Sequence, residues 1–374
     1  MKNKILYIIP SAEIGGTENM VIALTSNIKL FNFEPVVLTL QHRGPFHEIL
    51  DKYLIKNYYL NLKKNPLYGV IKCVFIFFRE KPCLVQSFLF AGNIFARILR
   101  IFFPVPLICS QRSTDDWRKK IHWMVERYTS FLCCLIVSNS NAGKRVLMEK
   151  AGINCNKIVV IPNGIDIEKI KQYKTKIGSF LHRGIVVGSI GNLRKAKGYD
   201  VLVEAASIVC KKRKDIRFII IGKGPLEHYL KKKIKQLHID DSVEFYGFVD
   251  NVYNYILHFD IVIIPSLWEG FPVVALESMA CGKPIIATTA GDMPEIIQDG
   301  INGLIVEPGN AKAMADALIK LVDNPNLMKK MGERSEGLVE KFSLNNMVRE
   351  YVSVYENILQ KMQPKFKKKH LNKV

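Results

Sequence analysis

The chain has 374 residues, 48% of them hydrophobic, with eight cysteines and a formal net charge of +20. This length suits two domains with separate cores, and the apolar content excludes wholesale disorder. The cysteines form no C-x-x-C pair, which predicts buried thiols rather than a disulfide framework or a metal site, and no uncharged stretch of about 18 residues marks a membrane-spanning helix.

The positive charge is concentrated in the first half of the chain and in the tail. Residues 1–178 hold 26 Lys and Arg against 12 Asp and Glu, whereas residues 179–360 hold 22 of each. Residues 361–374 add six lysines and no acid. A general preference for lysine should affect both halves alike, so we expect the first half to face an anionic substrate or an acidic surface.

The first half alternates predicted strands with predicted helices. The strands are expected at residues 5–9, 35–40, 84–87, 105–109, 134–137 and 157–160. The helical stretches between them include residues 17–30, 67–79 and 116–131. Turn residues at 161–166 end this series, and the polar segment 168–182 predicts a linker.

A second series of strands follows the linker. Its strands are expected at residues 185–190, 217–221, 243–245, 261–264, 284–287 and 304–306, with helices in the gaps and a last helix at about 344–362. Two such series predict an α/β fold with two doubly wound parallel sheets. The expected domains are residues 1–178 and 179–345. Residues 346–374 should form a helix that packs back toward the first domain, followed by a lysine-rich tail.

Two carboxylates, Glu269 and Glu277, flank the start of a predicted helix. Pro272 suits the first position of that helix, and Gly282 followed by Pro284 suits its end. The free N–H groups of a helix N-terminus favour an anion such as a diphosphate. A carboxylate on each side of it can bind the hydroxyls of two sugars, as a nucleotide-sugar site requires.

Two glycine-containing loops end strands of the same predicted sheet. Residues 191–198 carry Arg194, Lys195 and Lys197, and residues 222–225 read Gly-Lys-Gly-Pro. Ligands of such sheets bind at the carboxyl edge, where these cations would neutralise a diphosphate and stabilise it as a leaving group. A solvated basic loop and a plain Gly-Pro turn remain alternatives.

The first half offers a turn at Gly15-Gly16 and an arginine, Arg112, after a predicted strand. The glycines would let a ligand approach the backbone, although a tight turn capped by Thr17 explains them equally well. Arg112 would face a ligand cleft or lie on the surface. The aromatic and basic residues of 84–109 and 117–131 fit an interfacial membrane surface, or helices with buried aromatics and basic outer faces, and core packing is favoured for most of these aromatics.

Together these stretches resemble the retaining GT-B glycosyltransferases of family 4, the group 1 glycosyl transferases. The matching segments, in chain order, are residues 15–18, 162–166, 191–198, 222–225, 265–272, 277–284, 291–297 and 302–306. The resemblance implies two Rossmann-like domains that face each other across a cleft, the second of which binds a nucleotide diphosphate sugar.

The resemblance also implies roles for individual residues. Glu277 would bind the donor ribose, Glu269 would lie beside the transferred sugar, and Lys197 would hold the diphosphate. The implied catalytic residues are Glu269, Arg194, Lys197 and Arg112. The implied donor-binding residues are Gly15, Gly16, Gly191, Asn192, Gly222, Gly224, Gly270, Phe271, Pro272, Val273 and Glu277. Because cations would balance the diphosphate, no metal and no other cofactor is implied.

Two positions depart from the family pattern. Asn192 stands where an arginine is common, and Gln111-Arg112 stands where many members carry a histidine. Arg194 is a candidate replacement for the first lost group, and Arg112 for the second.

We therefore expect a retaining transferase that moves a hexose or N-acetylhexosamine from an NDP-sugar, most simply a UDP-sugar. The expected acceptor is a saccharide or a polyprenyl-diphosphate-linked saccharide of a bacterial capsule, O-antigen or exopolysaccharide. The expected location is the cytoplasm, at the anionic inner face of the membrane, with no nucleic-acid partner. The alternatives are a catalytically idle GT-B subunit, suggested by the two departures, and a basic nucleic-acid-binding protein, for which no recognition motif is visible.

Overall fold

The computed structural model describes residues 3–114, 117–176 and 184–370, the last eight by their backbone alone. The chain divides into two compact units. The first combines Met1–Gly164 with Leu344–Val374, and the second is Ile165–Ser343. The predicted domain boundary between residues 178 and 179 lies outside the described residues.

The first unit is built on a seven-stranded parallel sheet with the order β3-β2-β1-β4-β5-β6-β7. Its strands are β1 (Asn3–Ile9), β2 (Phe33–Thr39), β3 (Lys56–Tyr59), β4 (Leu84–Phe88), β5 (Leu107–Gln111), β6 (Leu135–Ser138) and β7 (Ile158–Val160). Alternate residues of β1 enter opposite cores: Ile5 and Ile9 pack on one face of the sheet, and Leu6 and Ile8 on the other. The sheet is therefore buried on both faces, as parallel sheets require.

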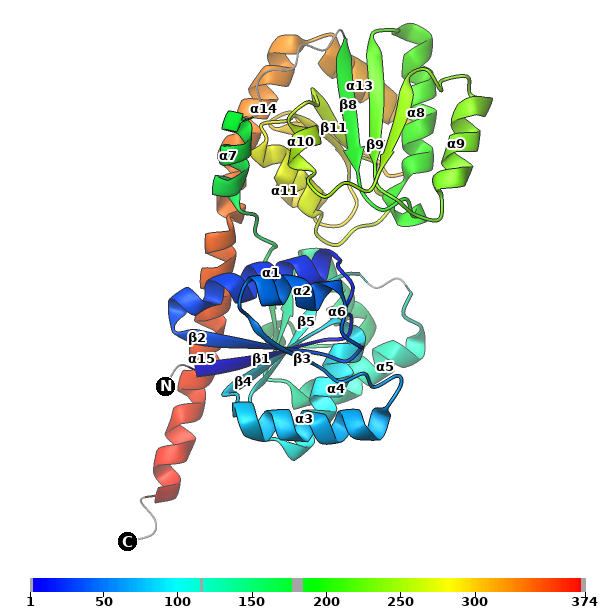
Figure 1. The fold of residues 1–374 in the computed structure, drawn as a ribbon. Helices are drawn as coiled ribbons and strands as arrows, with labels where there is room; N and C mark the ends of the chain where they lie inside the picture. The colour runs from blue at the N-terminus through cyan, green and yellow to red at the C-terminus, as the bar shows by residue number, and fades with distance from the viewer. Residues whose placement is uncertain (1–2, 115–116, 177–183, 371–374) are drawn as a thin grey trace. The chain divides into compact units, whose positions relative to one another are not determined.

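Helices cover both faces of this sheet (Figure 1). One core includes side chains from α1 (Gly16–Asn27), α2 (Pro45–Lys52) and α15 (Leu344–His370). The opposite core includes side chains from α3 (Pro66–Glu80), α4 (Leu89–Phe102), α5 (Lys120–Thr129) and α6 (Asn141–Ala151). Short 3-10 turns occupy Ile28–Phe31, Ser130–Leu132 and Cys155–Lys157.

The second unit holds a six-stranded sheet with the order β10-β9-β8-β11-β12-β13, again parallel throughout. Its strands are β8 (Ile185–Ile190), β9 (Ile216–Ile221), β10 (Val243–Gly247), β11 (Ile261–Ile264), β12 (Ile285–Thr288) and β13 (Gly303–Val306). The predicted fold class, α/β with two doubly wound parallel sheets, is confirmed.

The helices of the second unit also form two layers (Figure 1). One core takes side chains from α8 (Tyr199–Lys212), α9 (Glu227–Gln236) and α13 (Ala311–Val322). The other takes them from α7 (Ile167–Lys176), α10 (Tyr253–Ile256), α11 (Val273–Ala280) and α12 (Met293–Ile296). The helix α14 (Pro325–Val339) contributes Met331 to the first core and Val339 to the second. Two 3-10 turns complete the unit, η4 (Lys195–Lys197) and η5 (Glu340–Phe342).

One expectation was wrong, and one strand was not predicted. The linker expected at 168–182 is, in its described part, the helix α7, because Ile167 and Ile170 are buried in a core and the Tyr173 ring lies 5.7 Å from that of Tyr253. The remaining linker residues, 177–182, lie outside the described residues. The edge strand β3 was not predicted, because its sequence, Lys-Asn-Tyr-Tyr, has no apolar run and its residues are only half-buried or exposed.

In the part of the chain that the structure describes, no helix is long and apolar enough to cross a membrane.

Candidate functional site

Three of the predicted loops meet at the carboxyl edge of the second sheet. The strands β9, β8 and β11 are neighbours there, and each leads into one of these loops. The backbone hydrogen bonds that connect the loops run from Gly191 N–H to Ile221 O (2.9 Å), from Leu193 N–H to Lys223 O (3.1 Å) and from Leu267 N–H to Ala196 O (2.8 Å). The structure thus gathers these stretches at the edge where parallel α/β sheets bind ligands.

Two glycines allow this close packing of loops. Gly198 has φ +64° and Gly222 has φ +141°, a region that side chains disfavour. A Cβ at Gly198 would overlap the carbonyl oxygen of Pro265, and one at Gly222 would overlap that of Gly191. A Cβ at Gly224 would lie 2.5 Å from the carbonyl oxygen of Leu193.

The centre of this cluster is an ion pair between Lys197 and Glu269. Lys197 belongs to the loop after β8 and Glu269 to the loop after β11, so the pair connects two loops that are 72 residues apart in sequence. The Ser266 hydroxyl also donates to Glu269 Oε2, at 3.3 Å. Both charged side chains retain exposure, 28% for Lys197 and 15% for Glu269, and so remain accessible to a ligand.

The N-terminus of α11 follows directly. The helix begins at Val273. The sequence had predicted Pro272 as its first residue, but Pro272 is the extended residue before it. No side chain caps this end, so backbone N–H groups are available to an anion. The Phe271 ring packs 5.7 Å from that of Phe342.

Glu277 lies in the second turn of α11 and is half-buried. Burial raises the pKa of its carboxyl to about 7, although a hydrogen bond from the Tyr253 hydroxyl, 3.5 Å from Oε1, opposes the rise. The carboxyl therefore titrates near neutral pH. The sequence did not single out Tyr253, because the link between a tyrosine of α10 and a glutamate of α11 exists only in the folded unit.

The remaining predicted residues of this edge, Asn192 and Arg194, have exposed side chains in the loop after β8. Arg194 is the residue immediately before η4, the turn that carries Lys197. The two cations are therefore close neighbours on one loop.

In the first unit, the Gly15-Gly16 turn leads from β1 into α1. Gly15 is the extended residue before the helix and Gly16 its first residue, so the expected cap by Thr17 is wrong. The buried Glu18 fills the space beside Gly15, where a Cβ would lie 2.8 Å from Glu18 Oε2. A Cβ at Gly16 would meet no atom within 4 Å, which leaves this face of the turn open.

Arg112 follows β5 and is half-buried. Its guanidinium donates a hydrogen bond to the side chain of Asn163, in the turn after β7, and the buried Glu18 is near enough for its charge to act on Arg112. Burial lowers the pKa of Arg112, whereas Tyr351 of α15 and Glu18 oppose this effect. Within the first unit, the structure thus joins Arg112 to Asn163 of the predicted 162–166 motif and places it near Glu18 beside the Gly15 turn.

The aromatic residues of 84–109 and 117–131 divide into two groups. Phe88 and Trp123 are buried, and Phe90, Phe95 and Phe103 are half-buried. Phe102, Trp117, Tyr128 and Phe131 are 60–73% exposed. Core packing therefore accounts for five of these nine aromatics and leaves four on the surface.

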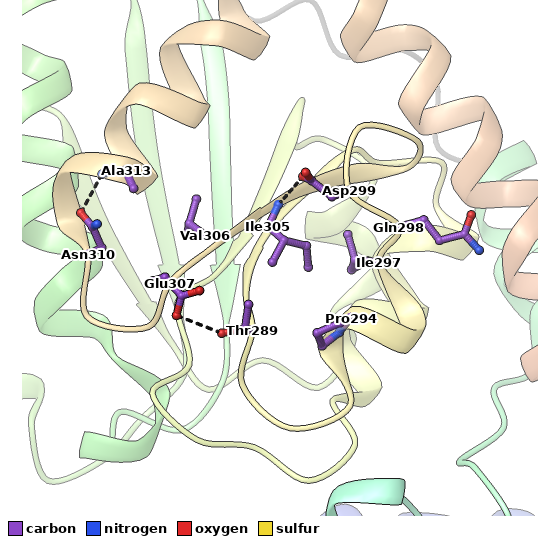
Figure 2. Close-up of a pocket in the computed structure, with 10 residues that line it drawn as sticks. All are labelled: Thr289, Pro294, Ile297, Gln298, Asp299, Ile305, Val306, Glu307, Asn310 and Ala313. Carbon is purple, nitrogen blue, oxygen red and sulfur yellow. Dashed lines mark hydrogen bonds between the residues drawn. The ribbon is translucent and has the colours of Figure 1, made fainter.

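Figure 2 shows a concavity that the sequence did not predict. It lies beside the ends of β12 and β13, and its lining residues are Thr289, Pro294, Ile297, Gln298, Asp299, Ile305, Val306, Glu307, Asn310 and Ala313. Its polar groups bond to one another: Asp299 accepts from Ile305 N–H at 2.9 Å, and Asn310 from Ala313 N–H at 2.9 Å. No predicted donor-binding residue lines it.

Two protein-family models match adjacent parts of the chain. Residues 171–337 match the family model "Glycosyl transferases group 1", and residues 14–169 match "Glycosyltransferase Family 4". The N-acetyl-alpha-D-glucosaminyl L-malate synthase of Bacillus anthracis is 37% identical over 172 residues, which are 46% of this chain and 45% of that protein. The alignment thus spans less than half of that relative's own length.

Other relatives align over more of the chain. The capsular polysaccharide biosynthesis glycosyltransferase CapM of Staphylococcus aureus is 24% identical over 80% of this chain and 83% of its own. Anabaena HepE in complex with UDP is 21% identical, with a TM-score of 0.83 over 95% of this chain and all of its own. A structure of HepE with UDP-glucose superposes with a TM-score of 0.81 over 95% of this chain and 99% of its own, at 20% identity.

The first prediction concerns the backbone at Gly198. We expect Gly198→Ala to lower the free energy of unfolding by about 2 kcal/mol, because it adds a Cβ at positive φ against the carbonyl of Pro265. Gly337→Ala is the matched control: it lies in α14, where a Cβ meets nothing within 4 Å, and it should be neutral or slightly stabilising. Denaturant titration measures both, and equal stabilities would contradict the role of Gly198.

The second prediction concerns Glu277. Its pKa is raised from 4.5 to about 7 in the folded chain, so its contribution to stability is fully present below pH 4.5 and is lost as the pH rises through 7. Between pH 5 and 8, the free energy of unfolding should therefore fall by roughly 1–3 kcal/mol less in Glu277→Gln than in wild type. Exposed Glu333→Gln in α14 should keep the wild-type dependence. Identical pH profiles for wild type and Glu277→Gln would show that Glu277 does not titrate in this range.

Proposed function

Because this chain belongs to the group 1 glycosyl transferases, we propose that it transfers a hexose or N-acetylhexosamine from a UDP-linked sugar, with retention of configuration. The observation that carries the proposal is the cluster of Lys197, Glu269 and Glu277 around the N-terminus of α11. It combines one cation, two carboxylates and free backbone N–H groups, which are the groups that a nucleotide diphosphate sugar requires.

In this proposal the diphosphate binds to the α11 N-terminus and to the loop after β8. Lys197 is paired with Glu269 in the structure and would turn its ammonium to the phosphate oxygens, with Arg194 beside it. Charge-assisted hydrogen bonds of this kind are among the strongest that a protein makes to an anion. The UDP and UDP-glucose bound to Anabaena HepE favour a uridine nucleotide here.

The two carboxylates would take the two sugars of the donor. Glu277 lies farther along α11 and would accept hydrogen bonds from the hydroxyls of the ribose. Glu269 would accept hydrogen bonds from hydroxyls of the transferred sugar. The backbone of Gly270, Phe271, Pro272 and Val273 would contact the same sugar. Gly191, Asn192, Gly222 and Gly224 shape the neighbouring loops.

The transfer breaks the bond between the anomeric carbon and the diphosphate oxygen, and the bonding electrons stay on the diphosphate. An acceptor hydroxyl forms the new bond to that carbon on the same face and passes its proton to the departing diphosphate. Because negative charge develops on the leaving group, Lys197 and Arg194 would stabilise the transition state more than the ground state. We propose that these cations serve in place of a metal ion.

We assign the Gly15-Gly16 turn and Arg112 of the first unit to substrate phosphates as well. A Cβ at Gly16 would meet no atom within 4 Å, so a ligand can approach the backbone there, and a hydrogen bond to Asn163 orients Arg112. The acceptor is proposed to be a saccharide or a polyprenyl-diphosphate-linked saccharide of a bacterial surface polysaccharide, as the capsule role in the name of CapM suggests. Such an acceptor would place the enzyme at the inner face of the cytoplasmic membrane.

The third prediction separates the two carboxylates in a transfer assay with UDP-sugars. Glu269→Gln should lower kcat about a hundredfold, because it removes a charge beside the reacting sugar. Glu277→Gln should raise the KM for the donor about tenfold, because it weakens a hydrogen bond from the ribose.

The control is Glu307→Gln, a carboxylate at the carboxyl edge of the same sheet that lines the concavity of Figure 2. It should leave both constants unchanged. Wild-type kinetics in Glu269→Gln and Glu277→Gln would overturn the proposed site. Binding of UDP-sugars without turnover across a panel of acceptors would favour an idle subunit instead.

A further inference from the structure

The helix α3 exposes an apolar surface that no part of the described chain covers. One side of α3 packs on the sheet through Cys73, Ile76 and Phe77. The other side carries large apolar side chains that are 49–82% exposed: Leu67, Tyr68, Val70, Ile71, Phe75 and Phe78. A helix that is apolar on all sides is normally buried on all sides, so the outer side of α3 lacks a partner of its own polarity.

The exposed surface continues onto the end of α4. The ring of Phe103, which follows α4, stacks on Phe77 with centroids 4.5 Å apart, so the two helices are packed together there. Ile101 and Phe102 next to it are 64% and 72% exposed. We call the six α3 side chains together with Ile101 and Phe102 the α3–α4 face.

The neighbouring helix α5 covers the same side of the sheet and exposes Ile121, Met124 and Tyr128. By contrast, the whole described part of the second unit exposes five large apolar side chains: Tyr229, Tyr246, Phe248, Trp268 and Ile301. The excess is therefore local to one side of the first unit. It is not a general property of the chain.

The charges around the α3–α4 face have one sign. Among the described residues between 60 and 134, the two carboxylates are Glu80 and Glu126, and both are buried in ion pairs. Glu80 bonds to Lys4 (3.0 Å) and Lys56 (2.7 Å), and Glu126 to Arg97 and Arg118. The exposed cations at the two ends of α3 are Lys63, Lys64, Arg79 and Lys81. The face thus presents apolar side chains, and the exposed charged side chains that flank α3 among these described residues are cations.

We propose that the α3–α4 face docks on an anionic lipid bilayer, with α3 lying in the interface and its flanking lysines and arginines among the headgroups. Apolar insertion combined with cation attraction is the known physics of interfacial helices. A second copy of this chain would bring positive borders together, so self-association through this face is disfavoured. The choice of the inner leaflet rests on the proposed function, whereas the docking itself does not.

The test is co-flotation of the full chain with vesicles. Wild type should bind vesicles of phosphatidylcholine mixed with phosphatidylglycerol and should bind far less to phosphatidylcholine alone. The triple variant Ile71→Gln, Phe75→Gln, Phe78→Gln should lower the partition coefficient at least about tenfold, because three apolar groups no longer enter the bilayer. These side chains are exposed, so the fold should survive, which a thermal melt checks.

The matched control replaces three exposed apolar side chains of the same unit that lie away from this face. Leu30, Tyr53 and Leu54 are 78%, 50% and 86% exposed, and they lie at the ends of the segments that pack on the opposite side of the sheet. Their triple replacement by Gln should float like wild type.

Several outcomes would overturn the docking surface. They are equal flotation of the Ile71, Phe75, Phe78 variant and wild type, no binding of wild type to the mixed vesicles, and complete loss of binding on deletion of residues 363–374 alone. The proposal would also be overturned if wild type were a dimer and the variant a monomer while both floated equally, because the face would then bind a second copy of the chain. Turnover of UDP-sugar in solution, measured in parallel, keeps the two proposals separate: flotation without turnover would count against the function, and turnover without flotation against the docking.

Discussion

The ion pair between Lys197 and Glu269 is the interaction on which the candidate donor site depends. It joins the loop after β8 to the loop after β11, and the backbone bond from Leu267 to Ala196 supports the same junction. Gly198 makes the junction possible, because a side chain there would collide with Pro265. The pair therefore places a cation and a carboxylate before the N-terminus of α11, where a diphosphate and a sugar would need them.

Electrostatics distinguish the two units. In the second unit, charged side chains gather in one site. Glu277, whose pKa is raised, lies in α11, and Glu269, which pairs with Lys197, lies in the loop before that helix. In the first unit, the two described carboxylates between residues 60 and 134, Glu80 and Glu126, are buried in ion pairs, whereas many cations of the same range are exposed. The first pattern suits a small anionic ligand, and the second suits an extended anionic surface.

Much of this could be predicted from the sequence, because apolar runs mark buried strands regardless of context. The runs at 185–190 and 261–264 coincide with β8 and β11. The polar edge strand β3 gave no such signal. The helix α7 was not predicted because only Ile167 and Ile170 anchor this mostly polar and exposed helix in the core.

Within the site, motif order identified Glu269, Glu277 and Lys197 as separate residues. The direct pairing of Lys197 with Glu269, and the contact of Tyr253 with Glu277, follow only from the fold that brings distant segments together. The exposure of α3 was equally hidden, because an apolar helix reads the same in sequence whether one side or both are covered.

Titration calorimetry with UDP, which lacks the transferred sugar, tests the central claim that Lys197 holds the donor diphosphate. Lys197→Met should weaken UDP binding at least about tenfold, because it removes a charge-assisted hydrogen bond. Glu269→Gln should bind UDP as tightly as wild type or more tightly, because the competing partner of Lys197 is gone. Wild-type affinity in Lys197→Met, or a loss in Glu269→Gln as large as that in Lys197→Met, would contradict the account.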